Sequence, residues 1–300
     1  MDRRVKLALI GAALSAGLLL LCWFMAFHVG FAARADVSIL NGFTGLSHGS
    51  TRGLAYRIAH LCSPDPYVYL AAVPVLIALL RRRPLVALAI LAILIGANAT
   101  TELLKPLLAA SRPAPPPDDL ITVAQGSWPS GHATAAMSLA LCCVLAAPAR
   151  LRPWVAALGA AFAVVVSFSF LSLAWHYPSD VCGGFLIATA WTALGIAALF
   201  AVDRGRVPAK GTRRSLLEAL EPPVAAVCAA LALVAVVLLA RPHAVVAYAR
   251  LHKGFVVGAV VIAALGLALA TVVMLALRNL SGSGRAPTGA LRRGSPHGSG

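Results

Sequence analysis

The stretch Ala174–Ala201, "AWHYPSDVCGGFLIATAWTALGIAALFA", decides the fold class of this chain. Its last 21 residues, Val181–Ala201, contain no Asp, Glu, Lys, Arg or Pro. A helix needs roughly 20 apolar residues to cross the hydrocarbon core of a bilayer. The segment is therefore predicted to be a membrane-spanning helix, with His176 and Asp180 at the membrane surface just before it.

The whole chain has the composition of a membrane protein. It is 60% hydrophobic and 12% charged, whereas about a quarter of a soluble domain is charged. Its apolar runs are uniform rather than alternating, which favours helices over barrel strands. We predict an all-α, polytopic membrane helical bundle with eight spans: Leu7–Val29, Tyr67–Leu80, Leu85–Glu102, Ala133–Ala147, Trp154–Trp175, Val181–Ala201, Val224–Ala240 and Gly254–Leu277.

The chain divides at a charged segment between the sixth and seventh spans. Residues 1–202 are predicted to form a six-span functional core, and residues 203–221 a cytoplasmic linker. Residues 222–280 would then form a two-span hairpin. The Gly-, Ser- and Arg-rich residues 281–300 are expected to be a disordered cytoplasmic tail.

The basic residues predict the orientation of the chain. If the N-terminus is cytoplasmic, 17 of the 25 Lys and Arg residues fall on the cytoplasmic side, as the positive-inside rule requires. The net charge of +15 is thus explained by topology rather than by nucleic-acid binding. We expect a multi-pass plasma-membrane protein with both termini in the cytoplasm.

In this topology the polar ends of the third to sixth spans meet on the outer face. Ionisable groups near a bilayer are costly and are functional candidates by default. Lys and Arg donors suit phosphate, and a helix N-terminus binds anions. An aspartate that holds one imidazole nitrogen leaves the other free as a nucleophile, and a second histidine can supply a proton. The candidates are Lys105, Arg112, Ser130, Gly131, His132, His176 and Asp180.

Three motifs in this set resemble those of the type 2 phosphatidic acid phosphatase superfamily. The first is "KPLLAASRP" from Lys105 to Pro113, and the second is "PSGH" from Pro129 to His132. The third is "SFLSLAWHYPSD", which runs from Ser169 to Asp180. The family has an arginine where this chain has Phe170. The resemblance covers about residues 85–201.

The resemblance implies a role for each motif residue. Lys105, Arg112, Ser130, Ser169 and the Gly131 backbone would bind the phosphoryl group. His176 would attack phosphorus to form a phosphohistidine, Asp180 would orient His176, and His132 would protonate the leaving group. The resemblance implies no metal and no cofactor. A zinc ion on His132, His176 and Asp180 would be opposed by the two nearby cations.

We therefore expect an integral membrane phosphatase that hydrolyses a lipid phosphate or diphosphate at the outer face. Candidate substrates are polyprenyl phosphates and diphosphates, phosphatidic acid and phosphatidylglycerol phosphate; a lipid phosphotransferase is an alternative. Phe170 motivates another alternative, a catalytically weak lipid-phosphate-binding protein, unless Arg52 or Arg57 replaces the missing guanidinium. A transporter is disfavoured because the charged groups lie at one surface rather than at the midplane.

Overall fold

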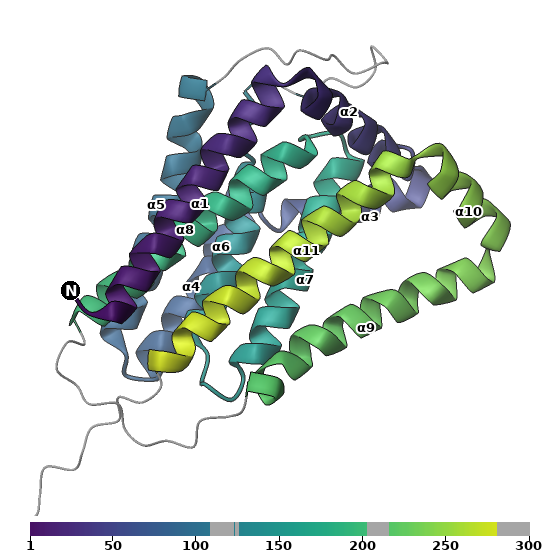
Figure 1. The fold of residues 1–300 in the computed structure, drawn as a ribbon. Helices are drawn as coiled ribbons and strands as arrows, with labels where there is room; N and C mark the ends of the chain where they lie inside the picture. The colour runs from purple at the N-terminus through teal and green to yellow at the C-terminus, as the bar shows by residue number, and fades with distance from the viewer. Residues whose placement is uncertain (109–122, 124–125, 203–215, 281–300) are drawn as a thin grey trace, which may run out of the picture.

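The computed structural model describes residues 1–108, 123, 126–202 and 216–280, and all of its regular elements there are helices. They follow one another along the chain as α1 (Arg3–His28), α2 (Gly30–Thr44), α3 (Gly49–His60), α4 (Pro64–Leu80), α5 (Pro84–Leu108), α6 (Gly131–Ala146), α7 (Arg152–Ser172), α8 (Pro178–Val202), α9 (Leu216–Ala240), α10 (Pro242–Leu251) and α11 (Lys253–Ala276), with a short 3-10 turn over Leu277–Leu280 (Figure 1).

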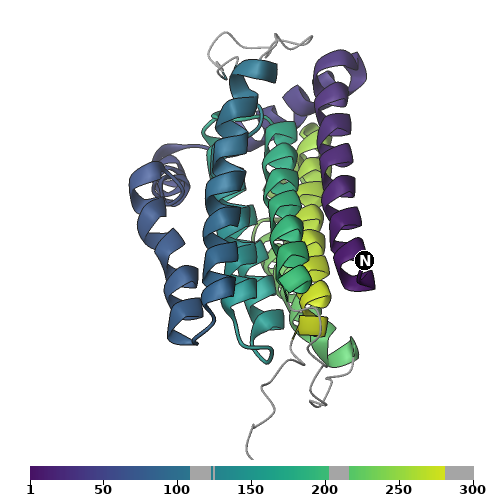
Figure 2. The same ribbon diagram turned by 90° about the vertical axis from the view of Figure 1, so that its left-hand side faces the viewer.

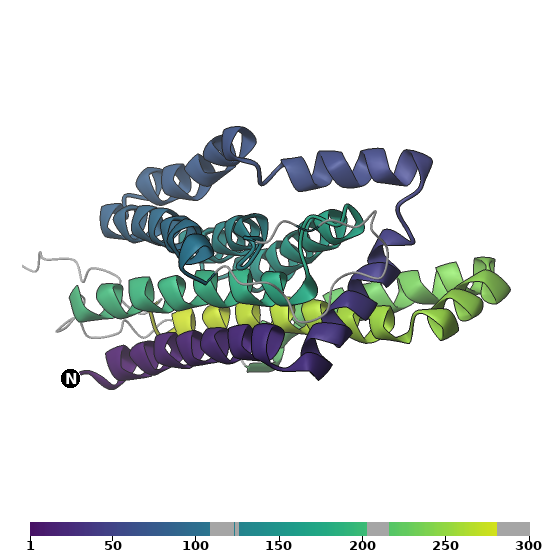
Figure 3. The same cartoon turned by 90° about the horizontal axis from the view of Figure 1, so that it is seen from above.

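These helices form one bundle around α6. This helix packs against α5, α7 and α8, and 13 of its 16 residues are buried. Figure 2 shows the long helices side by side with roughly parallel axes. Seen from above in Figure 3, α3 and α4 lie on one side of the bundle and α1 on the other, where it packs along α8. The arrangement confirms the predicted polytopic helical bundle.

Among the residues that the structure describes, six helices are long and apolar enough to cross a membrane by themselves: α1, α5, α7, α8, α9 and α11. A seventh crossing is possible if α3 and α4, which meet at a bend of 56°, count together as one span. The remaining predicted span, at Ala133–Ala147, falls on α6, which is apolar but shorter. A helix surrounded by other helices meets protein rather than lipid on most of its surface, so it can be shorter than the hydrocarbon core.

The last two predicted spans differ in how they pack. Helix α11 packs against α2, α7 and α8 of the bundle, whereas α9 packs against α7 and leaves most of its surface exposed. Figure 1 shows α10 joining the far ends of these two helices at the edge of the molecule. The division into a core and a terminal hairpin stays a prediction. Residues 203–215 of the predicted linker (203–221) and the predicted tail (281–300) lie outside the described residues, and residues 216–221 of that linker form the start of α9.

Basic side chains gather at one end of the bundle. The Arg81 guanidinium donates a hydrogen bond to the Ala146 carbonyl at the end of α6. Arg152 Nη1 donates to the Leu277 carbonyl at 2.9 Å, and Arg4 lies 5.1 Å from the centre of the Phe200 ring. Burial, and then the neighbouring Arg81, lower the pKa of Arg83. Since α6 runs from Gly131 to Ala146, these cations lie at the end opposite the predicted site.

Candidate active site

His176 lies in the turn between α7 and α8, Asp180 lies in the first turn of α8, and the two side chains face each other. His176 Nδ1 is 3.4 Å from Asp180 Oδ2, and the same nitrogen is 3.2 Å from the Ser127 carbonyl oxygen. A carbonyl and a carboxylate only accept hydrogen bonds, so Nδ1 must carry the proton. The tautomer fixed in this way leaves His176 Nε2 with its lone pair free, as a nucleophile requires.

Asp180 is held by the start of α8. It is 0% exposed, and its Oδ2 accepts the Tyr177 backbone N–H at 2.9 Å. A carboxylate in the first turn of a helix is stabilised by the helix dipole. The Asp180 carbonyl oxygen also accepts the Ser130 N–H at 3.0 Å, which joins this turn to the start of α6. The His–Asp pair and the PSGH segment are thus one connected structure.

Ser130 is the N-terminal cap of α6. Its Oγ accepts the Ala133 N–H at 3.2 Å, and the residue is 0% exposed. A capping serine satisfies one of the free N–H groups at a helix start and leaves others available for an anion. The Trp128–Pro129 peptide bond before it is cis. The start of α6 therefore offers backbone donors next to His176.

Lys105 brings a cation to the same place. Its Nζ pairs with Glu102 Oε1 at 2.6 Å. A Cβ atom at Gly131 would lie 3.3 Å from that carboxylate oxygen and 3.5 Å from Lys105 Nζ. The absence of a side chain at Gly131 thus lets the ion pair approach the helix start. The predicted Arg112 lies outside the described residues, so its position relative to Lys105 stays a prediction.

His132 completes the pair of imidazoles. The centres of the His132 and His176 rings are 6.0 Å apart, and Trp175 lies 5.5 Å from the His132 ring. His132 Nε2 is 3.5 Å from the hydroxyl of Ser63, at the bend between α3 and α4. The structure therefore brings both predicted catalytic histidines to one site.

Phe170 is fully buried against both histidines. Its ring centre lies 5.1 Å from that of His176, nearly edge-on at 75°, and 5.9 Å from that of His132. The phenyl ring thus lies beside the imidazoles, where it packs but cannot donate to a phosphoryl oxygen. Ser169, also predicted to bind phosphate, is buried and donates its hydroxyl to the Val165 carbonyl of its own helix at 2.8 Å. Arg52 and Arg57 are exposed on α3.

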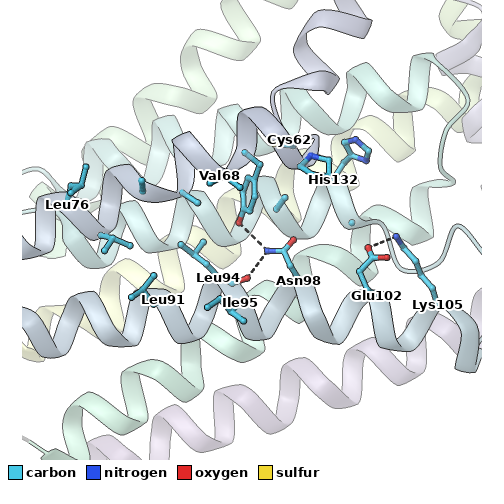
Figure 4. A pocket seen from close by; sticks show the side chains of 17 residues that line it. Cys62, Val68, Leu76, Leu91, Leu94, Ile95, Asn98, Glu102, Lys105 and His132 are labelled. Atoms are coloured by element: carbon cyan, nitrogen blue, oxygen red, sulfur yellow. Dashed lines mark hydrogen bonds and ion pairs between the residues drawn. The ribbon is translucent and has the colours of Figure 1, made fainter.

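An apolar groove of about 790 Å³ leads away from these residues between α4, α5 and α6 (Figure 4). Lys105, Glu102, Gly131 and His132 lie at its polar end, and Leu76 and Leu91 lie at the far end. Several apolar side chains that line it are exposed along its length, among them Val68 and Ile95. A groove of this kind fits a hydrocarbon chain whose charged head lies at Lys105.

Asp36, which the sequence reasoning did not select, supports the site from α2. The carboxylate is 6% exposed and accepts hydrogen bonds from the Ser179 backbone N–H, at 2.9 Å, and from the Ser179 hydroxyl. Ser179 immediately precedes Asp180. The sequence does contain a signal for Asp36. The buried residues of α2 recur at helical spacing, and Asp36 is the charged one among them.

Among the described residues, no group of three or more His, Cys, Asp or Glu side chains could hold a metal ion. The expectation that the reaction needs no metal or cofactor stays a prediction, because the arrangement of side chains does not test what the reaction requires.

Comparison with known proteins supports the resemblance noted in the sequence. The family model described as PAP2 superfamily matches residues 86–204. A comparison with curated proteins found no match. The fold is similar to the crystal structure of the first transmembrane PAP2 type phosphatidylglycerolphosphate phosphatase from Bacillus subtilis, with a TM-score of 0.56 and 20% sequence identity. The similarity covers 65% of this chain and 99% of that chain.

Proposed function

Since the PAP2 superfamily model matches residues 86–204, we propose that this integral membrane protein is a phosphatase that hydrolyses a lipid phosphate or diphosphate. The observation that carries the proposal is the position of His176. Its Nδ1 is held by Asp180 and the Ser127 carbonyl, and its ring lies 6.0 Å from that of His132, which lines the polar end of the apolar groove. A water-soluble phosphate ester would make no use of such a groove.

In the proposed complex, the phosphoryl oxygens lie at the start of α6. The N–H groups there and the Lys105 ammonium supply positive potential. Arg112 is proposed to add a guanidinium, and Ser130 and Ser169 to contribute hydroxyls. Charge on the equatorial oxygens is then stabilised by fixed donors, which is the main contribution to catalysis in phosphoryl transfer.

The reaction is proposed to take two steps. His176 Nε2 attacks phosphorus and forms an N–P bond while the P–O bond to the lipid breaks. His132 gives a proton to the departing lipid oxygen, and Asp180 stabilises the positive charge that develops on His176. In the second step, water attacks phosphorus, loses a proton to His132 and releases inorganic phosphate from His176. If a lipid hydroxyl replaces that water, the same intermediate makes the protein a phosphotransferase.

The site is proposed to face the outside of the plasma membrane. Support comes from the basic side chains Arg81, Arg83 and Arg152, which lie at the opposite end of the bundle, together with the positive-inside rule. Single cysteines at Ala124 and Ser215, both outside the described residues, test this orientation. An impermeant reagent applied to intact cells should label the first and not the second. The reverse result would contradict the proposed orientation.

Phosphate release by the purified protein in detergent tests the function. The panel comprises phosphatidic acid, phosphatidylglycerol phosphate, and polyprenyl phosphate and diphosphate, each with and without a chelator. We expect release from at least one lipid, unchanged by chelator and abolished in His176→Ala. His243→Ala is the matched control, because His243 is exposed on α10. Undiminished release by His176→Ala would refute the phosphohistidine mechanism.

A second candidate is a lipid-phosphate-binding protein with little or no turnover. Phe170 favours it, since its ring packs against both histidines where the family has an arginine. The same assay separates the two candidates. Binding of a lipid phosphate without release of phosphate from any member of the panel would establish the second one.

A further inference from the structure

The apolar groove contains a polar cluster that lies between its polar end and its far end. Asn98 of α5, Tyr67 of α4 and Ser138 of α6 meet there, and the first two line the groove (Figure 4). Polar side chains within membrane spans commonly tie helices together through hydrogen bonds. That role accounts for most atoms of this cluster, but one atom is left over.

The donors in the cluster can be assigned one by one. The Ser138 hydroxyl donates to the Ala135 carbonyl at 3.1 Å, so the Tyr67 hydroxyl donates to Ser138 Oγ at 3.2 Å. Asn98 Nδ2 donates to the Tyr67 hydroxyl at 3.2 Å and to the Leu94 carbonyl at 2.8 Å. A carbonyl cannot donate, so the amide nitrogen and not its oxygen must face Leu94. Both N–H groups of the Asn98 amide are therefore used.

The atom left over is Asn98 Oδ1. Within the part of the chain that the structure describes, no group donates a hydrogen bond to it. Leu94 and Ile95 flank it in the groove wall, so its surroundings are apolar. An amide oxygen accepts hydrogen bonds and donates none. At this depth the groove thus offers an acceptor that only a ligand or water can satisfy.

The depth of this acceptor follows from the helix geometry. Asn98 lies seven residues before Lys105 on α5, and Ser138 lies seven residues after Gly131 on α6. At about 1.5 Å per residue, both intervals are about 10 Å along the helix axes. A lipid whose phosphate lies at Lys105 and Gly131 therefore passes Asn98 about 10 Å further along.

We propose that the groove selects a lipid phosphate that carries a hydroxyl or amide N–H about 10 Å from the phosphoryl group, and that this group donates to Asn98 Oδ1. The inference rests on the proposed function and narrows its substrate class. Fully esterified lipids with plain acyl chains, and polyprenyl phosphates, have no donor there. They would cover Asn98 Oδ1 without satisfying it, which is costly in apolar surroundings.

The test compares matched lipids in the His176→Ala variant, so that the lipid is not consumed. Two synthetic phosphatidic acids of equal chain length are used, one with a 3-hydroxyacyl chain and one without the hydroxyl. A third carries its hydroxyl near the end of the chain. Equilibrium binding in detergent should be about 10-fold tighter for the 3-hydroxy lipid than for either other lipid, as one satisfied hydrogen bond implies.

Asn98→Leu should bring that ratio to one. The substitution also removes the donor to Tyr67, but this loss affects all three lipids alike and cancels in the ratio. Thr100→Val is the matched control: it breaks a polar contact of α5 outside the groove, the hydrogen bond from Trp191 Nε1 at 3.0 Å. The control should keep the preference.

Equal binding of the three lipids would overturn the inference, as would a preference that persists in Asn98→Leu. Binding of none of them would overturn the assignment of the groove itself. Phosphate release by protein with His176 intact is measured in parallel. A clear binding preference without phosphate release supports the inference and contradicts the proposed phosphatase function. Phosphate release without any binding preference supports the phosphatase function and contradicts the inference.

Discussion

Replacing Asp180 with asparagine removes a charge from the site and keeps its shape. The Asp180 oxygen that accepts the Tyr177 N–H at 2.9 Å is the same oxygen that lies 3.4 Å from His176 Nδ1. In the variant, the amide oxygen should take that place, because an amide NH₂ group cannot accept the Tyr177 hydrogen bond. The Ser127 carbonyl still holds the Nδ1 proton. The tautomer of His176 should therefore survive.

The magnitude follows from the distance. Two unit charges separated by 3.4 Å attract each other by about 5 kcal/mol at an effective dielectric constant of roughly 20. His176 gains only part of a unit charge on the way to the transition state, so a loss of about 3–4 kcal/mol is expected. At about 1.4 kcal/mol per tenfold, this corresponds to a fall in kcat of roughly 10²–10³.

The assay measures kcat and KM for the best lipid phosphate of the panel, with thermal unfolding in detergent as a check on folding. KM should change little, since Lys105 and the start of α6 are the proposed phosphate-binding groups. Asp180→Ala is the comparison: it also removes the acceptor of the Tyr177 N–H and should cost about 1–3 kcal/mol of stability. A kcat for Asp180→Asn within tenfold of wild type, or an effect confined to KM, would refute the electrostatic argument.

Three further variants test other parts of the site. His132→Ala should slow release from lipid phosphates by about 10²–10⁴ but spare an aryl phosphate, whose leaving group needs no proton; equal losses for both would exclude the acid role. Phe170→Arg should raise kcat/KM, by up to roughly 10²–10³, and lower the melting temperature unless phosphate is present, because it buries a guanidinium. A folded variant with no gain, together with inactivity of Arg52→Ala or Arg57→Ala, would point to a substitute cation. Asp36→Ala should lower stability by about 1–3 kcal/mol and lower kcat more than it raises KM, since it frees the turn before Asp180; unchanged melting and kinetics would remove Asp36 from the support of the site.

Much of this fold could be predicted because membrane helices are encoded locally. An apolar run such as Val181–Ala201 must form its hydrogen bonds internally in lipid, so its length and composition suffice to predict a helix. The candidate site residues could be predicted for a similar reason. The chain crosses the membrane back and forth, so the end of one span and the start of the next lie on the same face. His132 and His176 were thus predicted to meet, and their rings lie 6.0 Å apart.

Helices that lie outside the apolar runs were not predicted. Helices α2 and α3 are too polar or too short to register as spans, although α2 buries a regular stripe of residues. The bend of 56° between α3 and α4 was also missed. Asp36 was missed for the same reason: it lies on α2, and its partner Ser179 is 143 residues away in the sequence.

The sequence by itself thus determined the class of fold, the family resemblance and the chemical types present at the site, because each depends on residues close together along the chain. Only the tertiary structure decided which groups touch. The Ser127 carbonyl lies 3.2 Å from His176 Nδ1, and Phe170 packs against both imidazoles. The groove and the acceptor of Asn98 arise where three helices meet. Such contacts depend on how helices distant in sequence pack against one another, and no local pattern of residues specifies that packing.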